Sequence, residues 1–283
     1  MTTTEQAAPT PAAPVAGSAP ASSGHSGIKE ALGSVGEIAR FSGSVVRSLP
    51  DVRRYSSEVL AQAGILILSS GLIIWVMQGV IGFECGLEAS YTLKQIGAPI
   101  YSGVFNAWCS LREMSPYMWG YIFAAKVGCG LVAEIGSMRI ADEIDAMEVM
   151  GIKSRSYLVG SRVLAVWLCI PFLYTVGLGV TYVAAYLVTV VNLGGVSPGG
   201  YLYIFWLYQN PADFLYSLMK VITMSTVITF VGCYYGFTAR GGSVGVGRNT
   251  AKSMMLNMVL IHIVGVLGTQ LFWGLAPNAP IAN

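Results

Sequence analysis

The chain has 283 residues, of which 54% are hydrophobic and 11% are charged, and its formal net charge is +2. A soluble domain usually carries about a quarter of charged residues, so this composition argues against a soluble globular protein. The small net charge also argues against the basic surface that nucleic-acid-binding proteins need. The five cysteines form no C-x-x-C pair and the two histidines are far apart, so no metal motif can be assigned.

The N-terminal region divides into two parts. Residues 1–27 are mostly Ala, Pro, Ser, Thr and Gly, and they have too few large apolar side chains to offset the entropy of ordering. We therefore expect a disordered tail. Residues 28–58 place Ile38, Phe41 and Val45 at helical spacing among several arginines. This pattern predicts an amphipathic helix in the membrane interface, and a soluble helix packed on a partner is the alternative.

Five apolar stretches follow, each long enough to cross the hydrocarbon core of a bilayer. They comprise residues 59–83, 97–131, 157–190, 213–237 and 252–275. The second and third are longer than a bilayer requires, and Pro116 and Pro171 within them are candidate break points. The predicted fold class is an all-α integral membrane protein with an N-terminal interfacial amphipathic helix and five transmembrane helices.

The positions of lysine and arginine predict the orientation, because these residues concentrate in cytoplasmic loops. They are frequent in the N-terminal region, in segment 134–156 and in loop 238–252, whereas loop 191–212 has none. The N-terminus is therefore expected in the cytoplasm, and the C-terminus, after five spans, on the other side of the membrane.

Segment 134–151 is the most distinctive part of the sequence. Four acids lie between Asp142 and Glu148, a density that the hydrocarbon does not tolerate, so the segment is expected in water. Gly151 is well placed to end a helix there. We predict a cytoplasmic helix between the second and third spans.

The side chains of this helix divide into faces. Ile140, Ile144 and Met147 share an apolar face, and another face carries an acidic stripe formed by Asp142, Asp145 and Glu148. Arg139 and Glu143 are four residues apart and could form a weak ion pair. Such a helix suits insertion into a groove of a soluble partner, and a solvated connector is the alternative.

Several charges fall inside the apolar stretches. Arg112 and Glu113 are adjacent in the second span, Lys126 follows in the same span, and Lys220 lies in the fourth. Charges in hydrocarbon are costly and indicate a functional cavity. The alternatives are a span end or structural ion pair for the first two, and a snorkelling side chain for Lys126.

No complete nucleotide or catalytic motif is present. The glycine-rich run 242–247 lacks the lysine and the hydroxyl residue that a phosphate-binding loop needs. No Ser/His/Asp or Cys/His set indicates nucleophilic catalysis. A docking helix without a nucleotide motif predicts a permease whose energy comes from a separate subunit.

Four sequence runs resemble the MlaE/YrbE permease family. They are Leu111-Arg-Glu-Met-Ser-Pro116, Ala124-Ala-Lys-Val-Gly128, Ala133-Glu-Ile-Gly-Ser-Met-Arg139 and Glu143-Ile-Asp-Ala-Met-Glu-Val-Met-Gly151. The run 241–247, which follows Cys233-Tyr-Tyr-Gly236, is most similar to the B-type YrbE paralogue of actinobacteria. The family often has Arg-Ala-Gly where this chain has Lys126-Val-Gly128, and lysine lacks the planar fork of arginine.

The resemblance implies that residues 59–275 form the permease domain of an Mce-type ABC lipid transporter in a bacterial plasma (inner) membrane. The implied partners are an A-type YrbE permease paralogue in a heterodimer, a cytoplasmic ATPase similar to MlaF or MceG, and extracytoplasmic MCE-domain proteins. ATP and Mg would bind the ATPase, so no cofactor, metal or catalytic residue is expected in this chain. Fatty acids, mycolic acids, sterols and phospholipids are all open as substrates, and import is the expected direction.

The resemblance also implies two sets of site residues. The ATPase coupling helix comprises Glu134, Gly136, Met138, Arg139, Asp142, Glu143, Asp145, Met147, Glu148 and Gly151. The lipid path includes Arg112, Glu113, Lys220, Leu93 and Ile96. Two alternatives stay open: a secondary transporter driven by ions or protons, in which Glu113 titrates, and a non-transporting membrane anchor for MCE proteins.

Overall fold

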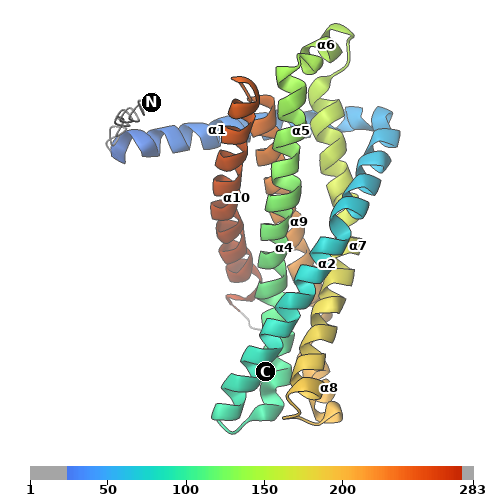
Figure 1. Ribbon diagram of the computed structural model, residues 1–283, viewed down its shortest axis with the longest axis vertical. Helices are drawn as coiled ribbons and strands as arrows, with labels where there is room; N and C mark the ends of the chain where they lie inside the picture. Colours follow the sequence, from blue (N-terminus) through green and yellow to red (C-terminus); the bar gives the residue numbers. More distant parts are fainter. Residues whose placement is uncertain (1–23, 276–283) are drawn as a thin grey trace, which may run out of the picture.

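The computed structural model describes residues 24–275, and the regular elements in this range are all helices (Figure 1). Five helical segments are long and apolar enough to cross a membrane, which confirms the all-α integral membrane fold. Residues 1–23, which make up most of the predicted disordered tail, lie outside the described residues.

The five segments differ in regularity. The first is α2 (Ser56–Gln95), the fourth is α9 (Pro211–Phe237) and the fifth is α10 (Gly242–Trp273). The second runs through η2 (Pro99–Tyr101), α3 (Ser102–Trp108), η3 (Cys109–Met114), α4 (Ser115–Phe123), η4 (Ala124–Gly128) and α5 (Cys129–Ile140). The third runs through η5 (Arg155–Gly160), α7 (Ser161–Tyr186) and η6 (Leu187–Asn192). The segments η3, η4, η5 and η6 are π-helical.

The two candidate break points behave differently. Pro116 lies at the start of α4, directly after the π-helical η3, so the segment changes its winding there without ending, and the Arg112 carbonyl four residues earlier accepts from Lys220. Pro171 lies inside α7, which continues without a break, so the prediction of a break there is wrong. Proline is tolerated within a membrane helix because neighbouring groups can satisfy the carbonyl that it leaves without a donor.

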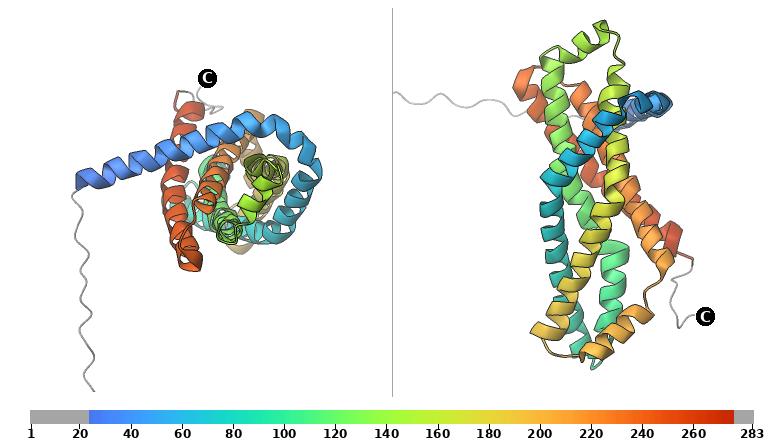
Figure 2. Two further views of the ribbon diagram at one scale, coloured as in Figure 1. Left: turned by 90° about the horizontal axis from the view of Figure 1, so that it is seen from above. Right: turned by 90° about the vertical axis from the view of Figure 1, so that its right-hand side faces the viewer.

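The helix α1 (Gly24–Ser48) lies across one end of the bundle, nearly perpendicular to the spans (Figures 1 and 2). It buries Ile38 and Val45, and the Phe41 ring contacts Tyr234 and Phe237 of α9. The predicted single helix over 28–58 is in fact α1 followed by the 3₁₀ segment η1 (Leu49–Tyr55), which turns the chain into α2. Its location in the membrane interface stays a prediction.

The core of the bundle depends on a close contact between α2 and α7. A Cβ atom at Gly82 would lie 2.1 Å from the carbonyl oxygen of Thr181, so only glycine fits there. One turn away, the Gln78 amide donates to the Ser115 carbonyl and accepts from the Thr181 hydroxyl. Small residues and buried polar contacts of this kind hold membrane helices together.

The connecting elements divide between the two ends of the bundle. The helix α6 (Glu143–Val149), α1 and the connection from α9 to α10 lie at one end, and α8 (Pro198–Leu207) lies at the other (Figure 1). The three segments predicted to be cytoplasmic therefore share one end. Which side of the membrane that end faces stays a prediction.

Candidate functional sites: a buried charged cluster and an exposed acidic helix

Two ion pairs connect η3 with α9 in the interior. Arg112 Nη2 lies 2.6 Å from Asp213 Oδ2, and Lys220 Nζ lies 3.0 Å from Glu113 Oε2. The adjacent residues Arg112 and Glu113 thus each reach across to α9. We refer to Arg112, Glu113, Asp213 and Lys220, with Thr269 and Trp273 of α10, as the charged cluster.

The first pair is fully enclosed. Asp213 is 1% exposed and accepts hydrogen bonds from Arg112 and, at 2.8 Å, from Trp273 Nε1. The guanidinium carbon of Arg112 lies 4.5 Å from the Trp108 ring centroid and 5.4 Å from that of Trp273. Arginine suits such a position because its planar group both hydrogen-bonds a carboxylate and stacks on aromatic rings.

The second pair is enclosed on one side only. The buried Lys220 ammonium donates to Glu113, to the Arg112 carbonyl at 2.8 Å and to Thr269 Oγ1 at 2.7 Å, which uses all three of its donors. The Glu113 side chain is 36% exposed, and its other oxygen lies 2.6 Å from Thr269 Oγ1. The cluster therefore presents an accessible carboxylate backed by a buried ammonium.

The sequence analysis missed Asp213, Thr269 and Trp273. Asp213 and Lys220 are seven residues apart, so they share one face of α9. This spacing could have identified Asp213 as a site residue from the sequence. Thr269 and Trp273 are four apart on α10 and look ordinary in an apolar span, so only the tertiary fold reveals their role.

The remaining predicted lipid-path residues lie apart from the cluster. Leu93 is half-buried and Ile96 is 70% exposed, at the carboxyl end of α2. The thiols of Cys85 and Cys109 are 3.3 Å apart, so α2 contacts the start of η3 at Cys85. Leu93 is eight residues, about 12 Å, further along α2 from that contact. The structure thus brings together three of the five predicted residues.

The predicted docking segment 134–151 consists of two helices rather than one. The helix α5 ends at Ile140, and Asp142 adopts a left-handed backbone with φ 56° before α6 begins. Aspartate tolerates this conformation better than most residues. The turn removes the helical spacing on which the Arg139–Glu143 pairing was based, and Arg139 pairs with Asp145 at 2.5 Å instead.

The faces of α6 also differ from the prediction. Ile144 is 1% exposed and belongs to a buried apolar cluster with residues of α1, α5 and η5, so it anchors α6 to its own chain. Ile140 is 40% exposed and Met147 is half-buried. The most exposed large apolar side chains of this segment are Val149 (89%) and Met150 (68%), which the sequence analysis did not select.

The exposure of the acids and the helix end at Gly151 are as predicted. Asp142, Glu143, Asp145 and Glu148 are all exposed. Gly151 has φ 79°, its N–H donates to the Glu148 carbonyl, and the next N–H donates to the Met147 carbonyl. This Schellman arrangement ends α6.

The other predicted coupling residues belong to α5 and serve its packing. Glu134 pairs with Arg162 of α7 at 2.5 Å. Gly136 is buried against Val246 of α10, and Met138 is half-buried beside Ile144. The segment thus joins the second span rigidly to the exposed α6.

A bundle of five membrane-length helices with paired charges in its interior has the architecture of a multi-pass membrane protein. Comparison with known proteins specifies the class. Residues 59–271 match the family model described as Permease MlaE. The chain belongs to the MlaE permease family.

The relatives agree with this assignment. A probable ABC transporter permease protein of Rickettsia bellii is 27% identical over 240 residues, which cover 85% of this chain and 92% of the relative. One from Synechocystis is 27% identical over 206 residues, 73% of this chain and 78% of the relative. Protein TRIGALACTOSYLDIACYLGLYCEROL 1, chloroplastic, of Arabidopsis thaliana is 26% identical over 166 residues, 57% of this chain and 46% of the relative. The predicted family is confirmed, and the B-type YrbE assignment stays a prediction.

Proposed function

We propose that the chain is the membrane permease subunit of an ATP-driven lipid transporter, forms half of the lipid path and is driven by a cytoplasmic ATPase. The observation that carries this proposal is the accessible Glu113 carboxylate held against the buried Lys220 ammonium within the spans. The polar head group of a lipid needs charged or hydrogen-bonding partners when it enters the hydrocarbon, whereas the acyl chain does not. The printed names of the relatives, ABC transporter permeases and a protein named for a glycolipid, agree with it.

In this proposal α6 receives the ATPase. Its exposed acids and the apolar Val149 and Met150 give a soluble partner both charge and buried area to recognise. The helical segment from Pro99 to Ile140 contains Glu113, and its carboxyl end is connected to α6. A displacement of α6 therefore passes along this segment toward the charged cluster.

The π-helical segments η3 and η4 lie along that route. Such segments are local irregularities that often occur at functional sites. Arg112 and Glu113 lie within η3, so a change in the winding of this segment would turn both side chains relative to α9. Movement of Glu113 away from Lys220 would free the ammonium for a lipid carboxylate or phosphate.

We further propose the setting that the family resemblance suggests. The chain is a B-type YrbE permease in a bacterial plasma membrane, paired with an A-type paralogue, an ATPase similar to MlaF or MceG and MCE-domain proteins. The N-terminus and α6 face the cytoplasm, and the C-terminus faces the opposite side. ATP and Mg bind the ATPase, and the lipid is imported.

The test is lipid transfer by the complete transporter in proteoliposomes. A fluorescent fatty acid and a fluorescent phospholipid are supplied, with ATP and with a non-hydrolysable analogue. Glu113→Gln should lower ATP-dependent transfer about tenfold, because the neutral side chain no longer displaces the lipid head group from Lys220, while assembly is retained. Glu88→Gln, an exposed acid on α2, is the matched control.

Each alternative predicts another result. A secondary transporter would lose transfer with a proton uncoupler and keep it with an inactive ATPase. A membrane anchor would show the same transfer for Glu113→Gln, for Glu88→Gln and for the unmodified chain. Either outcome overturns the proposal.

A further inference from the structure

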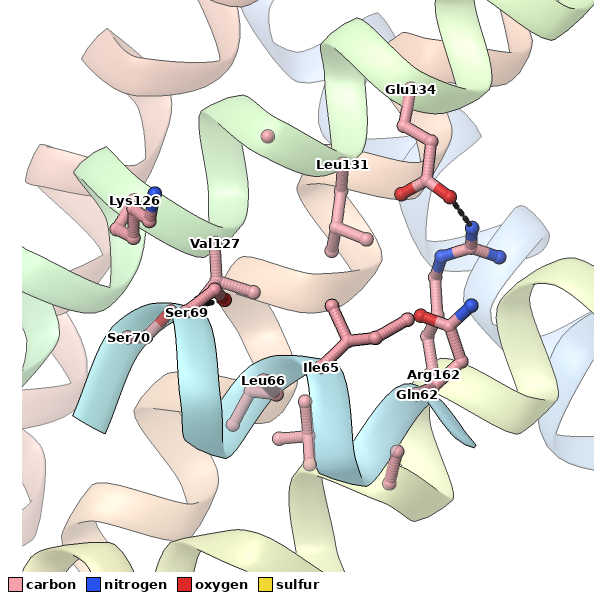
Figure 3. A pocket seen from close by; sticks show the side chains of 13 residues that line it. Gln62, Ile65, Leu66, Ser69, Ser70, Lys126, Val127, Leu131, Glu134 and Arg162 are labelled. Carbon is pink, nitrogen blue, oxygen red and sulfur yellow. Dashed lines mark hydrogen bonds and ion pairs between the residues drawn. The ribbon is translucent and has the colours of Figure 1, made fainter. Parts of the chain in front are cut away.

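A pocket lies between α2, η4, α5 and α7, on the half of the bundle nearer α1 (Figure 3). Its volume is about 210 Å³. The wall is mainly apolar, and polar groups lie at both ends. The lining residues are Gln62, Ile65, Leu66, Ser69, Ser70, Lys126, Val127, Gly130, Leu131, Glu134, Arg162, Ala165 and Val166. No residue of the charged cluster is among them.

One end of the pocket contains an incompletely satisfied arginine. The Arg162 side chain is 5% exposed, and its guanidinium donates to Glu134 at 2.5 Å and to the Leu158 carbonyl at 2.7 Å. Its buried Nε has no hydrogen-bond partner within the described range 24–275. A buried donor without an acceptor costs about 1–3 kcal/mol, so an oxygen supplied by a ligand would be stabilising.

The other end holds a free cation. Lys126 is exposed, and within the described part of the chain the structure gives it no ion pair or hydrogen bond. Glu134 already neutralises Arg162, so the pocket has one uncompensated positive charge. The long aliphatic stem of lysine lets its ammonium move along the pocket toward a head group.

The pocket opens sideways from the bundle. On α2 its rim is formed by Ile65, which is 59% exposed, and the neighbouring Leu68 is 86% exposed. These side chains lie on a helix that is long and apolar enough to cross the membrane, so acyl chains of the bilayer can contact them. Lys126 and Glu134 are eight residues apart, about 12 Å along the helix, and the Glu134 end is nearer α6. A ligand can therefore enter from one leaflet without crossing the bundle.

We propose that this pocket binds one anionic lipid from the leaflet nearer α1. The lipid phosphate lies at the end nearer α1, where Arg162 Nε–H donates to one of its oxygens, and the Lys126 ammonium extends along the pocket toward the same phosphate. One acyl chain packs against Leu66, Val127 and Leu131. The volume is about seven times that of a water molecule in the liquid, which accommodates part of one chain and leaves the rest in the bilayer.

The bound lipid bridges α2, the second span and α7 where α5 leads to α6. This site depends on the membrane setting and not on the proposed transport activity. Its occupancy can therefore be measured without an ATPase or a transport assay.

The test uses the full chain in nanodiscs of phosphatidylcholine that contain a minor fraction of photoactivatable phosphatidylglycerol. We expect cross-links to residues 62–70 and 126–134, located by peptide mass spectrometry. Lys126→Gln should reduce these cross-links about fivefold, as expected for the loss of one cation beside an anionic lipid. A photoactivatable phosphatidylcholine probe should show little change. Lys252→Gln, an exposed lysine on α10, is the control.

A second variant tests the cavity itself. A Cβ atom at Gly130 would meet nothing within 4 Å, so Gly130→Leu fits the fold and fills the pocket. It should reduce cross-linking by both probes. Gly179→Leu is the matched control, because Gly179 of α7 has equally open space and does not line the pocket.

Three results would overturn the proposal. One is unchanged phosphatidylglycerol cross-linking at these residues in Gly130→Leu. Another is an equal loss of both probes in Lys126→Gln. The third is a set of cross-links that maps only outside the two segments. Size-exclusion elution checks that each variant is folded, and if Lys126→Gln fails this check, Gly130→Leu decides.

Discussion

The charged cluster and the α6 end of the molecule contain the same kinds of ion pair in opposite environments. In the cluster, Asp213 and Lys220 are at most 2% exposed and their polar atoms are hydrogen-bonded. At the α6 end, the partners of the Arg139–Asp145 pair are 35% and 53% exposed. A buried charge without its partner destabilises the folded protein. An exposed ion pair contributes little to stability, and its charges are available to bind another protein. The cluster and α6 should therefore respond differently to the same substitution.

The largest expected effect is a difference in the free energy of unfolding between a variant of the charged cluster and a variant of α6. Asp213→Ala leaves Arg112 buried without its carboxylate, and breaking a buried pair in this way costs about 3–5 kcal/mol. Asp145→Ala removes an exposed partner and should cost less than about 1 kcal/mol. Unfolding of the purified chain in detergent, followed by tryptophan fluorescence against denaturant, measures both.

A double variant sharpens this comparison. Asp213→Ala combined with Arg112→Met removes both charges, so it should be more stable than Asp213→Ala alone. Equal unfolding midpoints for Asp213→Ala and Asp145→Ala would contradict the contrast between the buried and the exposed pair.

The next effect separates the regions by binding. Asp145→Lys reverses one charge of the acidic stripe, and it should weaken association with the ATPase by about tenfold while the unfolding midpoint stays nearly unchanged. Co-purification and a titration by surface plasmon resonance measure it. Asp51→Lys is the control, because it makes the same charge change at the same end and also removes an exposed ion pair. Equal affinities of the two variants would count against docking at α6.

The smallest effect concerns pH. Lys153 donates a hydrogen bond to Asp51 and attracts its negative charge, so the pKa of Asp51 is lowered from its ordinary value of 3.8. The stabilisation from this pair is fully present above the unfolded pKa and is lost as the pH falls through the lower folded pKa. An NMR titration of the Asp51 carboxyl should show this lowered pKa, and Lys153→Gln should return it toward 3.8. Lys252→Gln should leave it unchanged, and a pKa at the ordinary value in the unmodified chain would contradict the pairing.

The sequence predicted the architecture because hydropathy reports which segments lie in hydrocarbon. It did not predict where helices end in water: α5 continues to Ile140, nine residues past the expected end of the span, since polar residues can extend a helix beyond the membrane. The left-handed Asp142 was also hidden, because helical periodicity carries no signal for one residue of unusual backbone. A glycine with a clear helix-ending role, Gly151, was predictable from its type and position.

The candidate sites were predictable in part for the same reason. Arg112, Glu113 and Lys220 stood out because charges are rare within spans. Thr269 and Trp273 did not, since a threonine or tryptophan is common there and only the packing of α10 against η3 brings them to the charges. Ile144 fitted a docking face by periodicity, but tertiary contacts with its own chain use that face first.

The contact of α2 with α7 at Gly82 has a consequence for how the bundle can open. The Thr181 carbonyl leaves no space beside Gly82, and Gly86 approaches the Ala185 backbone in the same way one turn further on. Close backbone contact at successive turns resists sliding and rotation of the two helices, so we expect them to stay together when the bundle opens. The span with the smallest buried share is α10, so widening of the bundle is expected to cost least packing along α10, beside Thr269.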